Sequence, residues 1–194
     1  GVQTCALPIL TNKFHISGAE LSRISADKLY IGDENSGSIE VQNILSTQSN
    51  GVDDTLYLRA LKAEKSVSFI GQDSSFNQLS VQADRGITID TNVTTNTGNF
   101  DLDADVNASE HADAKITIAN AKALESYESL SLTASAGGIT GSGSLALKAN
   151  NGISINDNLS VADTLEIRSD LDENGSGLFL LEEGVAVEIG RAHV

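Results

Sequence analysis

A pattern of short alternating segments, repeated along the chain, constrains the fold more than any other feature of this sequence. The segment LSVQADRGITIDTNV (79–93) aligns without gaps with LALKANNGISINDNL (145–159), and the two share Leu, Ala, Gly, Ile and Asn at matching positions. The first half recurs as LSLTASAGGIT (130–140) and, more loosely, as LYLRALKAEKSVSF (56–69). Each unit places one alternation of apolar and polar residues before a polar turn and a second alternation, and such internal repetition is typical of repeat architectures.

The alternation has a period of two, which predicts β-strands with aliphatic side chains on one side and Ser, Thr, Asp and Lys on the other. Short strands with frequent turns suit a sandwich, a barrel or a solenoid. The solenoid is favoured because the repeat spans about 20 residues (79 to 100, 145 to 165), a plausible coil length. Small aliphatic residues also suit its narrow core. We therefore expect an all-β, parallel β-solenoid of roughly eight or nine coils, on the order of 40 Å long at about 4.8 Å per strand.

One segment conflicts with this interpretation. In ADAKITIANAKALESYE (112–128) the apolar residues are spaced almost as in a helix. The repeat alignment instead places KITIAN (115–120) over GLFLLE (177–182), which predicts a strand at 116–118. We follow the alignment and expect the strand.

The two ends differ from the repeats, and the only Cys and the only Pro are Cys5 and Pro8. One back-translation of EIGRAHV is GAGATCGGAAGAGCACACGTC, and the reverse complement of one back-translation of QTCALPI contains GATCGGAAGAGCACACGTC. The ends can thus be opposite strands of a DNA segment that resembles a sequencing-library adapter; a signal remnant and a polar tail are the alternative. We set aside residues 1–9 and 188–194, including Cys5 and His193, from fold reasoning. We expect residues 10–187 to be an uncapped β-helix repeat region of a larger protein.

Composition excludes several classes of function. The formal net charge of −15 disfavours nucleic-acid binding, because an acidic surface repels phosphate backbones. Apart from Cys5 the chain has no cysteine, which excludes disulfides and thiolate metal sites. No apolar run approaches the roughly 20 residues that span a bilayer, so we expect no membrane span. Aromatic residues make up only 4% of the chain, which suits a thin core of Leu, Ile, Val and Ala.

With the repeats aligned, the chain resembles the filamentous-haemagglutinin family of bacterial surface adhesins. The segment FHISGAELSRISADKLYIGDENSGSIEVQ (14–42) is similar to the Ala-Glu-Leu, Ile-Ser-Ala and Leu-x-Ile-Gly segments of that family. The Gly-Ile-Thr-Ile strands of the repeats also match the family pattern. The turns DLDADVN (101–107) and DLDENGSG (170–177) are similar to its Asp-rich turns, and the resemblance covers residues 14–187.

The resemblance implies a right-handed parallel β-helix. It also implies a very long protein exported across the outer membrane of Gram-negative bacteria by two-partner secretion, with an outer-membrane secretion partner. Such proteins are secreted or held at the cell surface as rods that carry binding regions for receptors or glycans. The family's secretion domain is not visible in this sequence, so the export route is an implication only.

The segment DLDENG (170–175) is the one candidate metal site. Asp170, Asp172 and Asn174 match the first half of a calcium loop, in which alternate carboxylates converge on a hard cation. The twelfth position of such a loop should be Glu, but it is Leu181, and the flanking residues predict strands rather than helices. A solvated turn rich in Asx residues is the better prediction, with calcium as the only candidate cofactor.

Carboxylates with a period of two occur in FDLDAD. Alternation predicts that Asp101, Asp103 and Asp105 point outward, where paired carboxylates could act as acid and base in a cleft. Candidate partners are spread along the chain without a shared register: Arg59, Arg85, Lys115 and Arg168. We therefore expect an acidic, hydrated surface rather than an active site.

The remaining polar residues give no site. His15 lies beside an apolar run and His111 lies in a polar insert, so each is expected to be exposed rather than a metal ligand. The glycines of SAGGITGSGS (135–144) do not follow a phosphate-binding pattern and are expected to form turns. Two histidines allow no Ser-His-Asp set.

The sequence therefore predicts a non-catalytic stalk segment of a large secreted adhesin that mediates attachment to cells or surfaces. One alternative is a β-helix enzyme acting on polysaccharide, which would need Asp, Lys or Arg converging on one surface in neighbouring coils. The other is a calcium-stiffened exported repeat module, although the G-G-x-G-x-D nonapeptides of β-roll toxins are absent from the sequence.

Overall fold

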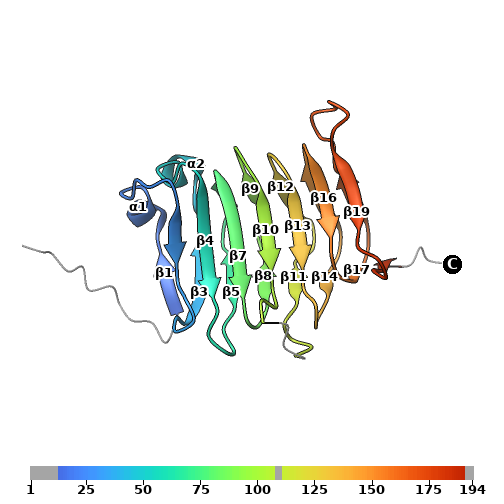
Figure 1. The fold of residues 1–194 in the computed structure, drawn as a ribbon, viewed down its shortest axis with the longest axis horizontal. Helices are drawn as coiled ribbons and strands as arrows, with labels where there is room; N and C mark the ends of the chain where they lie inside the picture. The colour runs from blue at the N-terminus through green and yellow to red at the C-terminus, as the bar shows by residue number, and fades with distance from the viewer. Residues whose placement is uncertain (1–12, 108–110, 191–194) are drawn as a thin grey trace, which may run out of the picture.

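The computed structural model describes residues 13–107 and 111–190, with side chains from residue 17 onward. Parallel strands stack in about seven turns and form a β-solenoid with almost no helix (Figure 1). This confirms the all-β solenoid predicted from the period-two alternation. The strands rise along the long axis in chain order, so each turn stacks on the one before it.

The strands form three parallel sheets, one for each side of the solenoid. Sheet 1 contains, in order, β1 (Lys13–Ile16), β3 (Ser38–Gln42), β5 (Val67–Ile70), β8 (Ile87–Ile89), β11 (Ile116–Ile118), β14 (Ile139–Gly141), β17 (Leu159–Val161) and β20 (Val187–Ile189). Sheet 2 contains β2 (Leu29–Ile31), β4 (Thr55–Ala60), β7 (Gln78–Ala83), β10 (Phe100–Asp103), β13 (Leu130–Thr133), β16 (Gly152–Ile155) and β19 (Leu178–Leu181). Sheet 3 contains β6 (Ser74–Phe76), β9 (Val93–Thr95), β12 (Lys122–Ser126), β15 (Leu145–Ala149) and β18 (Leu165–Arg168).

The turns differ in length because the corners differ in length. A full turn passes from sheet 2 to sheet 1 to sheet 3. Residues one turn apart pair in register, as Leu79 does with Phe100 and Leu145 does with Leu165. These two turns confirm the expected spacing of about 20 residues. The next turn runs from Phe100 to Leu130, because a long segment (104–115) separates sheet 2 from sheet 1 there. Longer turns explain why the chain makes about seven rather than the eight or nine expected.

The corner between sheet 1 and sheet 3 has a constant length. It contains three residues each time a strand of sheet 3 follows: 71–73, 90–92, 119–121, 142–144 and 162–164. Length variation is therefore confined to the other two corners. The strand expected at 116–118 is confirmed as β11, and the helical spacing around it is overridden by stacking on β8 and β14.

The aligned repeats occupy different sides of the solenoid. Residues 79–93 run through sheets 2, 1 and 3, whereas residues 145–159 run through sheets 3, 2 and 1. The repeat seen in the sequence is thus a strand, a corner and the next strand, not a whole turn. All corners share the same physical demand, a tight change of direction between two half-buried strands, so the pattern recurs without regard to side.

Helical turns replace the third strand in the first two turns of the solenoid. Helix α1 (Gly18–Leu21) contacts α2 (Ser46–Ser49), which contacts β6. The Ser17 hydroxyl accepts a hydrogen bond from the Glu20 amide (3.3 Å), and the Glu20 carboxylate accepts one from the Ser17 amide (2.9 Å). This capping box specifies α1 locally. The Ser49 hydroxyl donates to the carbonyl of Ser75 (2.7 Å) and so ties α2 to sheet 3.

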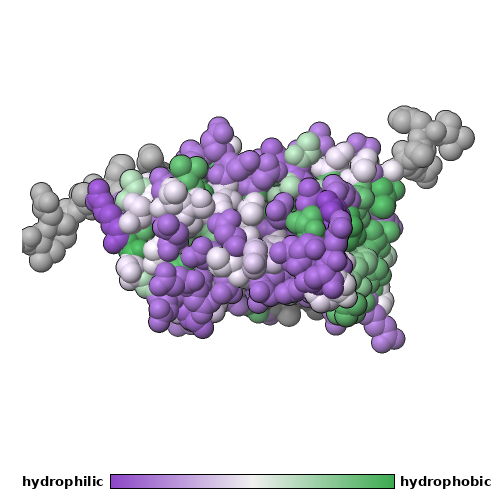
Figure 2. All heavy atoms as spheres, turned by 90° about the horizontal axis from the view of Figure 1, so that it is seen from above, coloured by the Kyte–Doolittle hydropathy of each residue, from purple (hydrophilic) through white to green (hydrophobic). Residues whose placement is uncertain are grey.

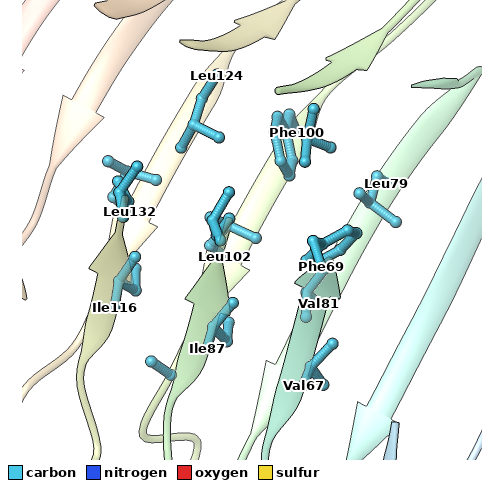
Figure 3. Close-up of a cluster of buried hydrophobic side chains, with 14 of the residues drawn as sticks. Val67, Phe69, Leu79, Val81, Ile87, Phe100, Leu102, Ile116, Leu124 and Leu132 are labelled. Carbon is cyan, nitrogen blue, oxygen red and sulfur yellow. The ribbon is translucent and has the colours of Figure 1, made fainter. Parts of the chain in front are cut away.

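One continuous apolar core fills the tube (Figure 3). Inward side chains stack in columns, one residue per turn, as in the sheet 1 column Val67, Ile87, Ile116, Ile139 and Leu159. Each of these five is almost completely buried. Phe69 and Phe76 meet edge to face, with ring centroids 6.5 Å apart. Each turn therefore buries its apolar residues mainly against its neighbours, as expected for a solenoid.

Glycine is required where turns approach most closely. Gly86 adopts φ +94°, and a Cβ atom there would lie 2.9 Å from the carbonyl oxygens of Asp113 and Lys115 in the next turn. Gly152, the aligned residue of the repeat, adopts φ +126° and lies equally close to Leu178. The shared Gly of the repeat thus marks a corner where stacking leaves no room for a side chain.

Candidate functional site

The outer surface of sheet 2 carries the most varied side chains. One outward column contains Tyr30, Tyr57, Ser80, Asp101, Ser131, Ser154 and Leu180. The rings of Tyr30 and Tyr57 stack in parallel with centroids 4.4 Å apart. Tyr30 remains 56% exposed. The column therefore begins with an aromatic stack, continues with polar groups and ends in an exposed leucine.

Two of the predicted carboxylates lie on this surface and the third does not. Asp101 is exposed and Asp103 is partly exposed, as predicted. Asp105 is only 3% exposed, so its predicted outward position is wrong. Strand β10 ends at Asp103, and beyond it the chain turns the corner, so the alternation no longer sets the direction of side chains. The carboxylate of Asp105 accepts a hydrogen bond from the amide of Ala136 in the next turn (3.2 Å).

The protein environment disfavours ionisation of the two surface carboxylates. Desolvation raises the pKa of Asp101. Desolvation also raises the pKa of Asp103, and the negative charges of Asp105 and Asp157 add to the effect, although the Asp105 amide donates to its carboxylate (3.2 Å). Raised carboxyl pKa values are a property that general acids need.

The expected basic partners do not converge on these carboxylates. Arg59 shares an outward column with Asp103, with Gln82 between them, so the prediction that it lacks a shared register is wrong. Two strand spacings, about 10 Å, still separate their backbones. Arg85 forms ion pairs at the corner with Asp113 (2.8 Å) and with Glu64. Lys115 lies at the same corner and Arg168 lies in sheet 3, so neither shares the surface of Asp101.

The candidate calcium segment forms an exposed loop between β18 and β19. The Asp170 carboxylate accepts from the amide of Gly175 (2.9 Å), and the Asp172 carboxylate accepts from the Asn174 side chain (2.7 Å). The side-chain Oδ1 of Asn174 accepts from the amide of Ser176 (2.8 Å). This is the geometry of the predicted Asx-rich turn. Among the described residues no three His, Cys, Asp or Glu side chains are grouped as metal ligands. Calcium binding therefore stays a hypothesis.

The remaining candidates are placed as follows. His111 is exposed, and its carbonyl accepts from the amide of Ala114 (2.8 Å). His15 lies in β1, but its side chain is outside the described part of the chain, as are Cys5 and His193. Gly137, Gly138 and Gly143 lie at corners, as predicted, whereas Gly141 lies in strand β14, so its predicted role as a turn residue is wrong.

Sequence reasoning missed a column of hydroxyls on sheet 1. Its members pair in register from turn to turn and face outward: Ser68, Thr88, Thr117, Thr140 and Ser160. The signal was present as the Ser or Thr between two inward residues in Val-Ser-Phe, Ile-Thr-Ile, Ile-Thr-Gly and Leu-Ser-Val. It could be found only once all these strands were assigned to one side of the solenoid. Between Glu40 and Glu188, which flank it in register, this column of an acidic protein carries hydroxyls rather than charged groups.

The C-terminal end of the solenoid is apolar and exposed. Figure 2 shows hydrophobic residues gathered at the end that carries the last strands. Its exposed large residues are Leu178, Phe179, Leu180, Leu181 and Ile189. Strand β20 includes Glu188 and Ile189, so it extends into the terminal segment that was set aside on sequence grounds.

Comparison with known proteins gives no relative: no family model, curated protein or solved structure matches this chain. In the described residues, no helix has the length and apolar character needed to cross a membrane.

Proposed function

We propose that this chain is a non-catalytic stalk segment of a large secreted surface adhesin that mediates attachment to cells or surfaces. The observation that carries the proposal is the unbroken stack of turns around one apolar core, from Leu21 to Val161. A stack of this kind holds its two ends at a fixed separation, because each turn is buried by its neighbours. The resemblance of residues 14–187 to filamentous-haemagglutinin adhesins supports the same function.

The lateral surfaces are consistent with a stalk. The outward columns are rich in Ser and Thr on sheet 1, include Ser and Asp on sheet 2, and include Glu, Lys and Arg on sheet 3. These polar groups keep a long protein hydrated, and the net charge of −15 repels like molecules. In this proposal the protein is exported to the bacterial surface with the help of an outer-membrane partner, and receptors or glycans bind to other parts of the full-length protein.

The neighbouring DNA provides the direct test. We expect the reading frame to continue on both sides as Leu-x-Leu-x-Ala and Gly-Ile repeats, with a secretion domain upstream. A reading frame that starts at Gly1 and stops after Val194 would contradict the proposal. A second test compares the adhesion of beads coated with the purified chain with that of beads coated with a longer chain that includes the flanking regions. We expect only the longer chain to adhere.

A polysaccharide-acting enzyme is the second candidate, because desolvation raises the pKa of both Asp101 and Asp103 on one open surface. Release of reducing sugar from a panel of neutral and acidic polysaccharides would reveal it. Activity that is lost in both Asp101→Asn and Asp103→Asn would favour the enzyme. We expect no release with either the parent chain or the variants.

A further inference from the structure

The chain contains three Asn-Gly pairs, at residues 50–51, 151–152 and 174–175. Asparagine in such a pair can lose its side-chain amide, because the backbone nitrogen of the next residue can attack the Asn Cγ atom and glycine hinders this approach least. The reaction needs a backbone that can move and an acceptor for the proton of the attacking nitrogen. The fold places the three pairs in very different surroundings.

Asn174 lies in the loop between β18 and β19, which projects from the side of the stacked turns (Figure 1). Asn174, Gly175 and Ser176 are all exposed. Gly175 has φ +83°, and no described atom lies within 4 Å of the place where a Cβ atom would be. The peptide unit that must move during the reaction is therefore not held by a neighbouring turn.

The attacking nitrogen already has a proton acceptor. The Gly175 amide donates to Oδ2 of Asp170 (2.9 Å), within the range of about 2.6–3.2 Å that a general base requires. The other carboxylate oxygen of Asp170, Oδ1, is buried and receives no hydrogen bond from the described residues. The carboxylate therefore meets the Gly175 amide without a competing donor.

The group to be attacked is folded over the same nitrogen. Oδ1 of Asn174 accepts from the amide of Ser176 (2.8 Å) and from the Ser176 hydroxyl, which closes a ring of atoms that includes the Gly175 nitrogen. The same two donors face the negative charge that develops on Oδ1 when Cγ is attacked. Nδ2 of Asn174 donates to the Asp172 carboxylate (2.7 Å), which fixes the orientation of the amide group.

We propose that Asn174 converts spontaneously to aspartate and isoaspartate in the folded protein, with Asp170 as the proton acceptor and Ser176 as the donor to the developing charge. The Gly175 nitrogen bonds to Cγ of Asn174, and its proton passes to Asp170. The bond between Cγ and Nδ2 breaks, and Nδ2 takes up that proton and leaves as ammonia. Water then opens the cyclic imide at either carbonyl, which gives aspartate or isoaspartate.

Asn151 has the same neighbour in sequence but is held in place. Gly152 begins β16, is buried and pairs in register with Leu178. A Cβ atom on Gly152 would lie 2.8 Å from the carbonyl oxygen of Leu178, so its peptide unit cannot rotate without disturbing the strand pairing. The Asn151 side-chain amide also donates to the carboxylate of Glu128 in the neighbouring turn (2.7 Å).

Asn50 is held by the first two turns. It ends α2 with φ −68° and ψ −8°, and its amide donates to the carbonyl of Ser46 (3.0 Å). The carbonyl of Gly51 accepts from the amide of Ala26 (2.9 Å), and the Ile24 carbonyl leaves no room for a Cβ atom on Gly51. We therefore expect Asn50 and Asn151 to be protected while the chain is folded.

The modification adds one negative charge to a loop that is already acidic. The isoaspartate form also inserts a methylene group into the backbone of the loop. Both changes lie outside the apolar core, so the stack of turns should persist. The inference does not depend on the proposed function, since it concerns only the chemistry of this loop.

Peptide mass spectrometry would follow the replacement of NH₂ by OH at each Asn-Gly pair during prolonged incubation of the purified chain at neutral pH. A sample unfolded in urea is the reference, because the three pairs lose their structural differences there and should react at similar rates. In the folded protein we expect Asn174 to react at least as fast as in urea. It should also react at least about tenfold faster than Asn50 or Asn151.

Two variants test the role of Asp170. Asp170→Asn and Glu173→Gln each remove one negative charge from the same loop, but the exposed Glu173 side chain bonds to neither reacting group in the described structure. Asp170→Asn should slow the reaction of Asn174 about tenfold in the folded protein and leave the rate in urea unchanged. Glu173→Gln should change neither rate, and melting temperatures would verify that both variants fold.

Four outcomes would overturn the inference. A slower reaction of Asn174 in the folded protein than in urea shows that the hydrogen bonds of the loop protect this residue. Reaction of Asn50 or Asn151 as fast as Asn174 in the folded protein shows that the surroundings do not control the rate. An unchanged rate in Asp170→Asn shows that Asp170 is not the proton acceptor. Equal slowing in Asp170→Asn and Glu173→Gln shows that only the charge of the loop matters.

Discussion

The internal turns and the last turn place apolar residues in the same inward column, but these residues differ in exposure. In the inward column of sheet 2, Phe100, Leu130 and Ile153 are essentially buried, while Phe179, the next residue of the same column, is 41% exposed. Strands β10, β13 and β16 alternate apolar and polar residues, whereas β19 is apolar throughout, but the residue of this inward column is apolar in all four strands. The comparison shows that burial in this fold is a property of the neighbouring turn, and that the sequence of a single turn specifies only which residues are able to be buried.

Truncation of two phenylalanines gives the largest expected contrast. Phe100→Ala removes a completely buried ring and should lower the free energy of unfolding by about 3–5 kcal/mol. Phe179→Ala, in the same column, should cost less than about 1 kcal/mol, because the ring already contacts water. Urea denaturation of the monomer would measure both. Equal losses would contradict the view that the neighbouring turn decides how deeply a residue of this column is buried.

Two glycines sharpen the comparison at the level of the backbone. Gly86 and Gly175 both have positive φ, but a Cβ atom on Gly86 meets two carbonyl oxygens whereas one on Gly175 meets no atom within 4 Å. Gly175→Ala should cost about 1 kcal/mol through conformational strain. Gly86→Ala should cost about 2–3 kcal/mol, since strain and displacement of the neighbouring turn add. Thermal unfolding of the two variants would separate the contribution of stacking from that of φ.

The first turn tests whether a local signal can replace stacking. Ser17→Ala removes the hydroxyl that caps α1 and should cost about 1 kcal/mol. Ser22→Ala is the control, because its hydroxyl is exposed and donates only to the carbonyl of Ala19 at the end of the same helix. Hydrogen exchange at the amides of α1 would detect local opening. If the two variants opened equally, the cap would contribute nothing to the N-terminal turn.

The smallest expected effects come from removing single charges. Removal should stabilise the protein at Asp101 and Asp103 and destabilise it at Asp113. The pKa of Asp101 and Asp103 is raised in the folded state, so these groups bind protons more tightly there than in the unfolded chain. Their unfavourable contribution is present at neutral pH and disappears as pH falls below the unfolded value. The double variant Asp101→Asn, Asp103→Asn should therefore stabilise the protein at pH 7, by less than about 1 kcal/mol after solvent screening, and have no effect near pH 3.

Asp113 provides the opposite case. Its hydrogen bond and ion pair with Arg85 lower the pKa of its carboxyl, so its favourable contribution is present above the unfolded value and is lost as pH falls through the folded one. Asp113→Asn should slightly destabilise the protein at pH 7, and the effect should be smaller at pH 3. Urea midpoints at the two pH values would compare both variants. Changes of the same sign would contradict the assigned causes.

The sequence was sufficient to predict the class of fold. Period-two alternation in strands such as 116–118 specified inward and outward residues, and the spacing of residues 79 and 100 predicted the length of the compact turns correctly. These features are local, because they depend on a few neighbouring residues and on the general requirement to bury aliphatic side chains.

What could not be predicted depends on contacts between turns. The alignment of 79–93 with 145–159 could not reveal that the two segments lie on different sides, since every corner imposes the same demand on the chain. Asp105 continues the alternation in sequence, but the strand has already ended, and a backbone amide of the next turn accounts for its burial. The capping box at Ser17 and Glu20 was a usable signal for α1, whereas α2 begins after Leu45 without a side-chain cap.

The recurrence of one strand-and-corner pattern on every side of the solenoid has a consequence for how such a protein can change. Gain or loss of a single strand-and-corner unit would leave the core intact but rotate everything that follows by one side, about a third of a revolution. Hydroxyl columns, carboxylates and aromatic stacks downstream would then point in a new direction without a single substitution. In a solenoid of this kind, a deletion of fewer than ten residues can reorient every downstream surface about the long axis.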